Sequence, residues 1–308
     1  MPTMADPVRV FDRALVRRRR ERAAAGFDRV GFLADAVGER IAERMDDVRR
    51  GFGTALLLGC RTGGLARRLA GRDDIGSLIR ADLALPMVQR AGRPGLVCDE
   101  EALPFGHGRL DLIVSLLGLH SVNDVPGALV QMRAALRPDG LLLAALPGGR
   151  TLVELRHALT AAELEVTGGA AARIAPFMDV RDAGMLLQRA GFALPIVDSE
   201  TITVTYGDAL TLMRELRAMG ESGPLAERTR PFLRRDVLVR AAEIYVQTFA
   251  DARGRLPATF EILFLTGWAP DPSQQQPARR GSGQARLAEA FGVPPEAIEG
   301  QADPHRDG

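Results

Sequence analysis

The sequence predicts an α/β protein with a doubly wound, mostly parallel sheet of seven strands, an N-terminal helical cap and a C-terminal helical lid. Short apolar runs alternate with helical patterns between residues 51 and 150, and these runs are nearly continuous rather than alternating. The first three runs also end in a glycine or an aspartate. Apolar strands separated by helices are typical of a parallel sheet covered on both faces.

The cap occupies residues 1–50, where Phe32, Leu33, Val37, Ile41 and Met45 form an apolar helical stripe. An arginine-rich stretch comes before it, "FDRALVRRRRERAA". It contains acids and lacks serine, so we interpret it as a solvated helix face rather than a transit peptide.

The core occupies residues 51–150. Five apolar runs predict strands at 54–59, 76–82, 95–99, 109–117 and 141–146, and helices are expected at 64–70, 86–91 and 125–140. Pro138 and Gly140 close the last helix in this interpretation.

Beyond residue 150 the rhythm changes. Within 151–270 we expect helices at 151–166, 179–192, 208–220 and 236–251, and strands at 193–206 and 258–270. The tail, 271–308, is rich in turn residues and partly disordered in this prediction.

Composition excludes several classes of protein. Net charge is +1, so no global field favours nucleic acid or an anionic membrane. All 40 basic residues are arginine, which excludes a lysine Schiff base and a P-loop lysine. Cys60 and Cys98 form neither a disulfide framework nor a zinc set, so a cytoplasmic location is expected. No apolar run reaches the roughly 18 residues that a membrane span requires.

The stretch "LLLGCRTGG" joins the first predicted strand to a helix. Gly59 and Gly63 permit a sharp turn and open the helix with free N–H groups, as in a cofactor loop. A tight turn in any doubly wound fold would look the same.

Two acids add context to this loop. Asp82 ends the second run, 23 residues after Gly59, where an acid binds a ribose hydroxyl pair; a helix N-cap is the alternative. Asp99 ends the third run, where a carboxylate can accept a hydrogen bond from an exocyclic amine, or can simply be a turn acid.

The order of "LLLGCRTGG", "ADLALPMVQRA", "CDEEALPF", "LDLIVSLLGLHSVND" and "RPDGLLLAAL" resembles the class I S-adenosylmethionine-dependent methyltransferases, which have a Rossmann-like fold. This resemblance implies S-adenosylmethionine, or bound S-adenosylhomocysteine, as the cofactor. It assigns contacts with the cofactor to Gly59, Cys60, Gly63, Asp82, Leu83, Asp99 and Glu100. Leu57 replaces an acid and Arg61 replaces a glycine of the family's usual loop.

Segments outside the sheet are similar to one branch, that of complex I assembly factor 5, and to BioC-like bacterial relatives. They include "FDRALVRRRRERAA", "IAPFMDVRDAGMLLQRAGF" and "LPATFEILFLTGW". The resemblance implies modification of an arginine on a protein substrate, an iron–sulfur subunit of complex I. Carboxyl methylation of a malonyl-carrier protein in biotin synthesis and a non-catalytic assembly chaperone are the alternatives. The sequence leaves the oligomeric state open.

Candidate catalytic residues follow the fourth strand, His120, Asn123 and Asp124. Histidine has a suitable pKa range for a base, although a histidine satisfied by the loop backbone is the simpler interpretation. Candidate substrate contacts are Arg150, Glu154, Glu221 and Ser222, which could also be ordinary helix and turn residues. No histidine or cysteine has metal-ligand spacing.

Overall fold

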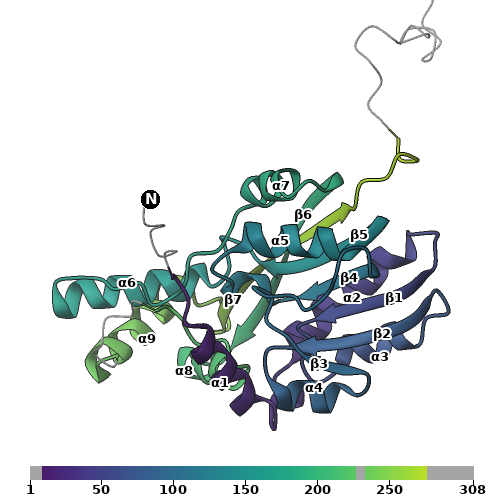
Figure 1. Ribbon diagram of the computed structural model, residues 1–308. Coiled ribbons are helices and arrows are strands. Elements are labelled where there is room, and N and C mark those ends of the chain that lie inside the picture. The colour runs from purple at the N-terminus through teal and green to yellow at the C-terminus, as the bar shows by residue number, and fades with distance from the viewer. Residues whose placement is uncertain (1–8, 227–232, 276–308) are drawn as a thin grey trace, which may run out of the picture. The chain divides into compact units, whose positions relative to one another are not determined.

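The computed structural model describes residues 9–226 and 233–275 of the 308-residue chain. Residues 1–271 form one compact unit, which holds every helix and strand described below. Its sheet has the strand order β3-β2-β1-β4-β5-β7-β6 (Figure 1). The strands are β1 (Phe52–Leu58), β2 (Ile75–Asp82), β3 (Gly95–Val97), β4 (Leu110–Leu116), β5 (Leu136–Pro147), β6 (Ala193–Tyr206) and β7 (Leu256–Trp268).

The first five strands are parallel, and β7 runs antiparallel between β5 and β6. From β1 the chain winds outward through β2 to β3, then returns to the other side of β1 as β4 and continues to β5. The direction therefore reverses between β1 and β4. In doubly wound folds, ligands bind beyond the carboxyl ends of the strands at this switch point.

The helices cover both faces of the sheet (Figure 1). One apolar cluster joins α5 and α7 to the sheet, and the other joins α2, α3, α4, α6, α8 and α9 to the opposite face. The bounds are α1 (Arg13–Ala23), α2 (Phe32–Asp46), α3 (Gly64–Ala70), α4 (Leu85–Ala91), α5 (Val125–Ala135), α6 (Val153–Thr167), α7 (Val180–Arg189), α8 (Ala209–Ala218) and α9 (Arg235–Phe249). Two short 3₁₀ turns are η1 (Phe27–Arg29) and η2 (Leu119–Ser121).

Successive side chains of the central strands point alternately into two apolar clusters, which explains why these strands are continuous apolar runs in the sequence. In β5, Leu141 and Leu143 belong to one cluster while Leu142 and Ala144 belong to the other. Because successive side chains of a strand point to opposite faces and both faces are covered, every position must be apolar. The prediction of a doubly wound sheet is confirmed, as are all seven strands.

Two details of the prediction are wrong. The helix expected at 125–140 ends at Ala135, and Leu136–Pro147 is strand, so Pro138 and Gly140 lie within β5. Phe32 is exposed, at 36%, although the other members of its stripe are buried. It is the first residue of α2 and lies off the buried face.

The start of the chain is tied to the segment between α8 and α9. Asp12 N donates to Pro224 O at 2.8 Å, and Ala226 N donates to Val10 O at 2.9 Å. The Arg19 guanidinium donates to the carbonyl oxygens of Ser222 and Gly223. Helix α1 and residues 221–226 therefore form one joined cover, which we call the cover segment. Among the described helices, none is long and apolar enough to cross a membrane.

The packing of β5 yields a stability prediction. Leu142 is fully buried, so Leu142→Ala should lower the free energy of unfolding by about 2–5 kcal/mol through lost burial and a residual cavity. Val130→Ala on the exposed face of α5 should stay within about 0.5 kcal/mol. Urea unfolding of both variants measures the difference, and equal losses would contradict the layer assignment.

Candidate functional site

The loop after β1 has the backbone of a tight turn. Gly59 and Gly63 have φ of 71° and 93°, in the region that favours glycine. A Cβ on Gly59 would lie 2.4 Å from Leu116 O, and one on Gly63 would lie 2.9 Å from the Cα of Ala91. Packing against neighbouring backbone alone therefore requires both glycines. Cys60 is buried between them, and burial raises the pKa of its thiol.

Asp82, at the end of β2, holds this loop in place. Its carboxylate accepts a hydrogen bond from Arg61 N at 3.2 Å and another from Ala84 N at 3.1 Å. The side chain is completely shielded from solvent, and Leu83 beside it is buried as well. Asp82 thus connects the first loop to Ala84, the N-cap residue of α4, without itself being the N-cap, and its assignment to a ribose stays a prediction.

Asp99 and Glu100 follow β3 and face α1. The Arg13 guanidinium lies 2.5 Å from Asp99 Oδ1 and also donates to Glu100 Oε2. Glu100 is 1% exposed. A Cβ on Gly118, after β4, would lie 2.6 Å from Glu100 Oε1, so glycine leaves room there for the acid.

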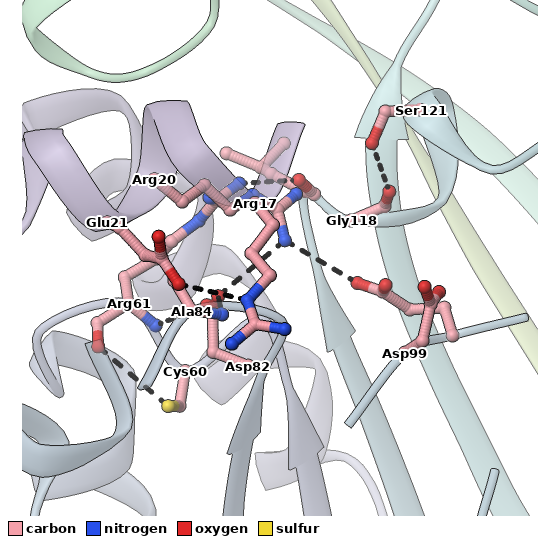
Figure 2. Close-up of polar contacts among 12 residues, drawn as sticks. Arg17, Arg20, Glu21, Cys60, Arg61, Asp82, Ala84, Asp99, Gly118 and Ser121 are labelled. Atoms are coloured by element: carbon pink, nitrogen blue, oxygen red, sulfur yellow. Dashed lines mark hydrogen bonds and ion pairs between the residues drawn. The ribbon is translucent and has the colours of Figure 1, made fainter. Parts of the chain in front are cut away.

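Two further arginines are buried among these acids. Figure 2 shows the Arg20 side chain extending from α1 toward Asp82, close to Arg61. Arg20 is 1% exposed, and its Nη1 lies 3.7 Å from both Asp82 Oδ1 and Glu100 Oε1. At that distance it forms ion pairs without hydrogen bonds, and none of its three guanidinium nitrogens has a hydrogen-bond partner among the described residues.

Arg61 is 3% exposed and has a φ of 50°, where glycine would be unstrained. Its Nη2 donates to Leu117 O at 2.7 Å and to Glu221 Oε1 at 3.0 Å. The side chain therefore crosses the switch point from the loop after β1 to the residue that follows β4. Its Nε and Nη1 lack hydrogen-bond partners in the described part of the chain.

Mutual charges set the ionisation of this cluster. Burial raises the pKa of Glu100, but Arg20 and Arg13 outweigh burial and hold that pKa below its usual value. Burial and the neighbouring Arg20 charge lower the pKa of Arg61. Glu100 is thus ionised at neutral pH, and its partners are guanidinium groups of the same chain.

His120 and Glu221 face one another at the edge of a cavity of about 450 Å³. His120 Nε2 lies 3.0 Å from Glu221 Oε2. Removal from water raises the pKa of Glu221, but His120, Arg61 and Arg20 hold it below the usual range. Apolar side chains from α2, α6, α8 and β7 form most of the cavity wall, including Leu33, Leu155, Leu159, Met213, Leu216 and Phe260.

The structure corrects two of the three catalytic candidates. Asn123 Oδ1 accepts a hydrogen bond from Phe11 N, and Asn123 Nδ2 donates to Phe11 O and to Glu101. Asp124 is exposed and caps α5 by accepting from Gly127 N at 2.8 Å. Asn123 therefore anchors Phe11 just before α1, Asp124 caps the start of α5, and His120 alone of the three faces the cavity.

The substrate candidates divide in the same way. Both carboxylate oxygens of Glu154 accept hydrogen bonds from Thr259, so this acid ties α6 to β7, which corrects its assignment to a substrate. The Arg150 side chain is exposed outside the cavity wall, and its backbone N donates to Glu261. Glu221 and Ser222 do line the cavity.

The sequence predicts that the arginine-rich stretch is a solvated helix face. In the structure only part of it is exposed to solvent. Arg13 and Arg20 lie seven residues apart and therefore share the inward face of α1, while Arg17 between them is exposed. That spacing, together with Asp82 and Glu100 at strand ends, is the signal that could have identified them. Among residues 9–226 and 233–275, no group of three or more His, Cys, Asp and Glu could hold a metal ion.

The ionised state of Glu100 predicts a pH dependence. Its lowered pKa means that its carboxylate stabilises the fold above the usual glutamate pKa, about 4.3, and that this contribution is lost as pH falls through the folded value. Glu100→Gln should cost about 3 kcal/mol at neutral pH, because Arg13 and Arg20 lose a partner.

The difference in the free energy of unfolding between Glu100→Gln and the wild type should shrink in acid, where Glu100 of the wild type is protonated and uncharged as well. Urea unfolding across this pH range checks it, with Glu21→Gln on the exposed side of α1 as the control that should change little. A difference that does not vary with pH would contradict an ionised Glu100.

The chain is similar in sequence to a known domain family and to several known proteins. A methyltransferase domain family matches residues 56–144, which span β1 to β5. The chain is 39% identical over 287 residues to the mitochondrial arginine-hydroxylase NDUFAF5 of Danio rerio, covering 91% of this chain and 89% of that protein. The human NDUFAF5 is 40% identical, with 91% and 83% covered.

A malonyl-[acyl-carrier protein] O-methyltransferase of Laribacter hongkongensis is 36% identical over 276 residues, covering 84% of this chain and 90% of that protein. In the fold alone, the chain is similar to the YcgJ protein of Bacillus subtilis, with a TM-score of 0.53 and 14% identity over 76% of this chain and 99% of that one. The matched relatives are named as enzymes. The chain therefore belongs to the methyltransferase-fold enzyme family that includes the NDUFAF5 arginine hydroxylases and the malonyl-[acyl-carrier protein] O-methyltransferases.

Proposed function

We propose that the chain binds S-adenosylmethionine at the carboxyl ends of β1, β2 and β3. The observation that carries the proposal is that the loop 59–63, Asp82 and Asp99 follow three strands that are neighbours in the sheet, next to the switch point. The acids fit the group chemically, because a ribose hydroxyl pair and an adenine amine are hydrogen-bond donors and carboxylates are acceptors. Asp82 would hold the ribose, and Asp99 with Glu100 the adenine.

When bound, this cofactor supplies a methyl group on a positively charged sulfur. The residues around the cavity would position the substrate, which is most of what a displacement requires. Glu221 is the acid in the cavity wall that can accept a substrate guanidinium. Because Glu221 is ionised, it accepts a hydrogen bond from His120 Nε2, while His120 Nδ1 has no hydrogen-bond partner among the described residues.

The proposed substrate is an arginine of a protein that is assembled into respiratory complex I, an iron–sulfur subunit as the resemblance implies. Support comes from the NDUFAF5 relatives, which share about two fifths of their residues with this chain over nine tenths of its length. We also propose a cytoplasmic location, because the cysteines form no disulfide framework.

Calorimetric titration with S-adenosylmethionine and S-adenosylhomocysteine tests the cofactor site. Asp82→Asn should weaken binding about 10- to 100-fold, since one charge-assisted hydrogen bond is lost. Asp111→Asn is the matched control, because Asp111 also accepts a backbone N–H, from Thr54, but lies at the opposite end of the sheet. No heat with either ligand would refute the cofactor proposal, and equal affinity of Asp82→Asn and the wild type would refute the ribose assignment.

Carboxyl methylation of a malonyl-carrier protein is the second candidate, favoured by the relative from Laribacter hongkongensis. Mass spectrometry of candidate substrates after incubation separates the reactions. A carrier protein heavier by a methyl group would support this candidate, and an arginine peptide heavier by one methyl group or one oxygen atom would support the first. Hydroxylation would require an added oxidant in that assay.

A non-catalytic assembly chaperone is the third candidate. The observation that favours it is that the acids assigned to the cofactor already pair with arginines of the chain. This pairing bears on cofactor affinity rather than on the fold.

A further inference from the structure

The acids of the proposed cofactor site are already paired. Arg13 contacts Asp99 and Glu100, Arg20 lies between Asp82 and Glu100, and Arg61 contacts Glu221. A guanidinium donates several hydrogen bonds, and the ribose hydroxyls and the adenine amine are hydrogen-bond donors as well. The chain's own donors therefore occupy the acceptors that the cofactor would use.

Arg61 lies at the switch point, where it most restricts the space for a ligand. Its side chain begins in the turn after β1 and ends at Leu117 O after β4, so it spans the switch point where the ligand of a doubly wound fold lies. A backbone φ of 50° favours glycine, yet the position holds the largest charged side chain. Substitution by glycine would empty this space without straining the turn.

Arg20 completes the block from the cover segment. It approaches Asp82 and Glu100 only to 3.7 Å and forms no hydrogen bond with a described residue, so these acids stabilise its charge but leave its N–H donors unsatisfied. A ligand that offers these carboxylates real hydrogen bonds can therefore replace it. Arg13 is the outer member, since its partner Asp99 remains 30% exposed.

We propose that Arg13, Arg20 and Arg61 are internal competitors of S-adenosylmethionine, which set a low affinity: Arg13 and Arg20 pair with the acids that would bind it, and Arg61 fills the switch point beside them. The proposal rests on the proposed function, because it concerns the same site. The cover segment must shift for the cofactor to enter: α1 carries Arg13 and Arg20, and its hydrogen bonds with Pro224, Ser222 and Gly223 make residues 221–226 move with it.

Calorimetry on the full chain tests the competition. Arg61→Gly and Arg20→Met should each bind S-adenosylhomocysteine at least about tenfold more tightly than the wild type, the size of one charge-assisted hydrogen bond. Arg17→Met is the matched control, because Arg17 is exposed on the same helix and pairs only with Glu21. It should bind like the wild type.

Affinity that is unchanged or weaker in both variants would overturn the proposal and mark these arginines as bystanders or cofactor contacts. If the wild type binds tightly and the variants bind no better, this proposal fails while the proposed function stands. If neither the wild type nor the variants bind, both fail.

Hydrogen exchange of the wild type at saturating S-adenosylhomocysteine gives a readout that does not depend on variant folding. Competition predicts faster exchange of the α1 amides, because α1 loses its anchors to Asp82, Asp99 and Glu100. Slower exchange of α1 would show that its arginines hold the ligand, and would overturn the proposal.

Discussion

The pairing of buried guanidinium groups with carboxylates at the strand ends is the interaction on which the site depends. Two neighbouring parallel strands, β2 and β3, place Asp82, Asp99 and Glu100 at one edge of the sheet, and α1 places Arg13 and Arg20 beside them. Each of these charges alone would be costly to bury. Together they fix α1 over the sheet, so the cap is held by electrostatics as well as by apolar packing.

The same pairing joins two segments that are distant in the chain. Arg61 reaches from the first loop to Glu221, while Arg19 binds the carbonyl oxygens of Ser222 and Gly223. The region between α8 and α9 is therefore attached to the cofactor loop on one side and to α1 on the other. Replacing any one of these charged residues should therefore alter the cavity, because His120 and Glu221 lie where the segments meet.

The fold could be predicted from the sequence because apolar periodicity indicates burial, and the central strands β1, β4 and β5 are buried on both faces of the sheet. The helix boundary at Ala135 could not, since Pro138 and Gly140 are tolerated inside β5 at its start, ahead of the paired run from Leu141. The positions of Asp82 and Asp99 were predictable from strand ends. Their partners were not predicted, because a run of arginines on a helix is ordinarily solvated, and only the seven-residue spacing of Arg13 and Arg20 indicates a shared inward face.

Leu57 and Arg61, the two unusual residues of the loop, have different consequences. Leu57 is fully buried in the apolar cluster beneath α2 and α3, so an acid there would need a partner that this packing does not provide. Arg61 instead adds a buried positive charge, which the neighbouring acids stabilise. The loop has thus exchanged a ligand-binding acid for core packing and an open glycine for an internal guanidinium. In our proposal the Arg61 guanidinium acts against a cofactor that must enter the same space, whereas Leu57 adds packing to the core and leaves the loop without that acid.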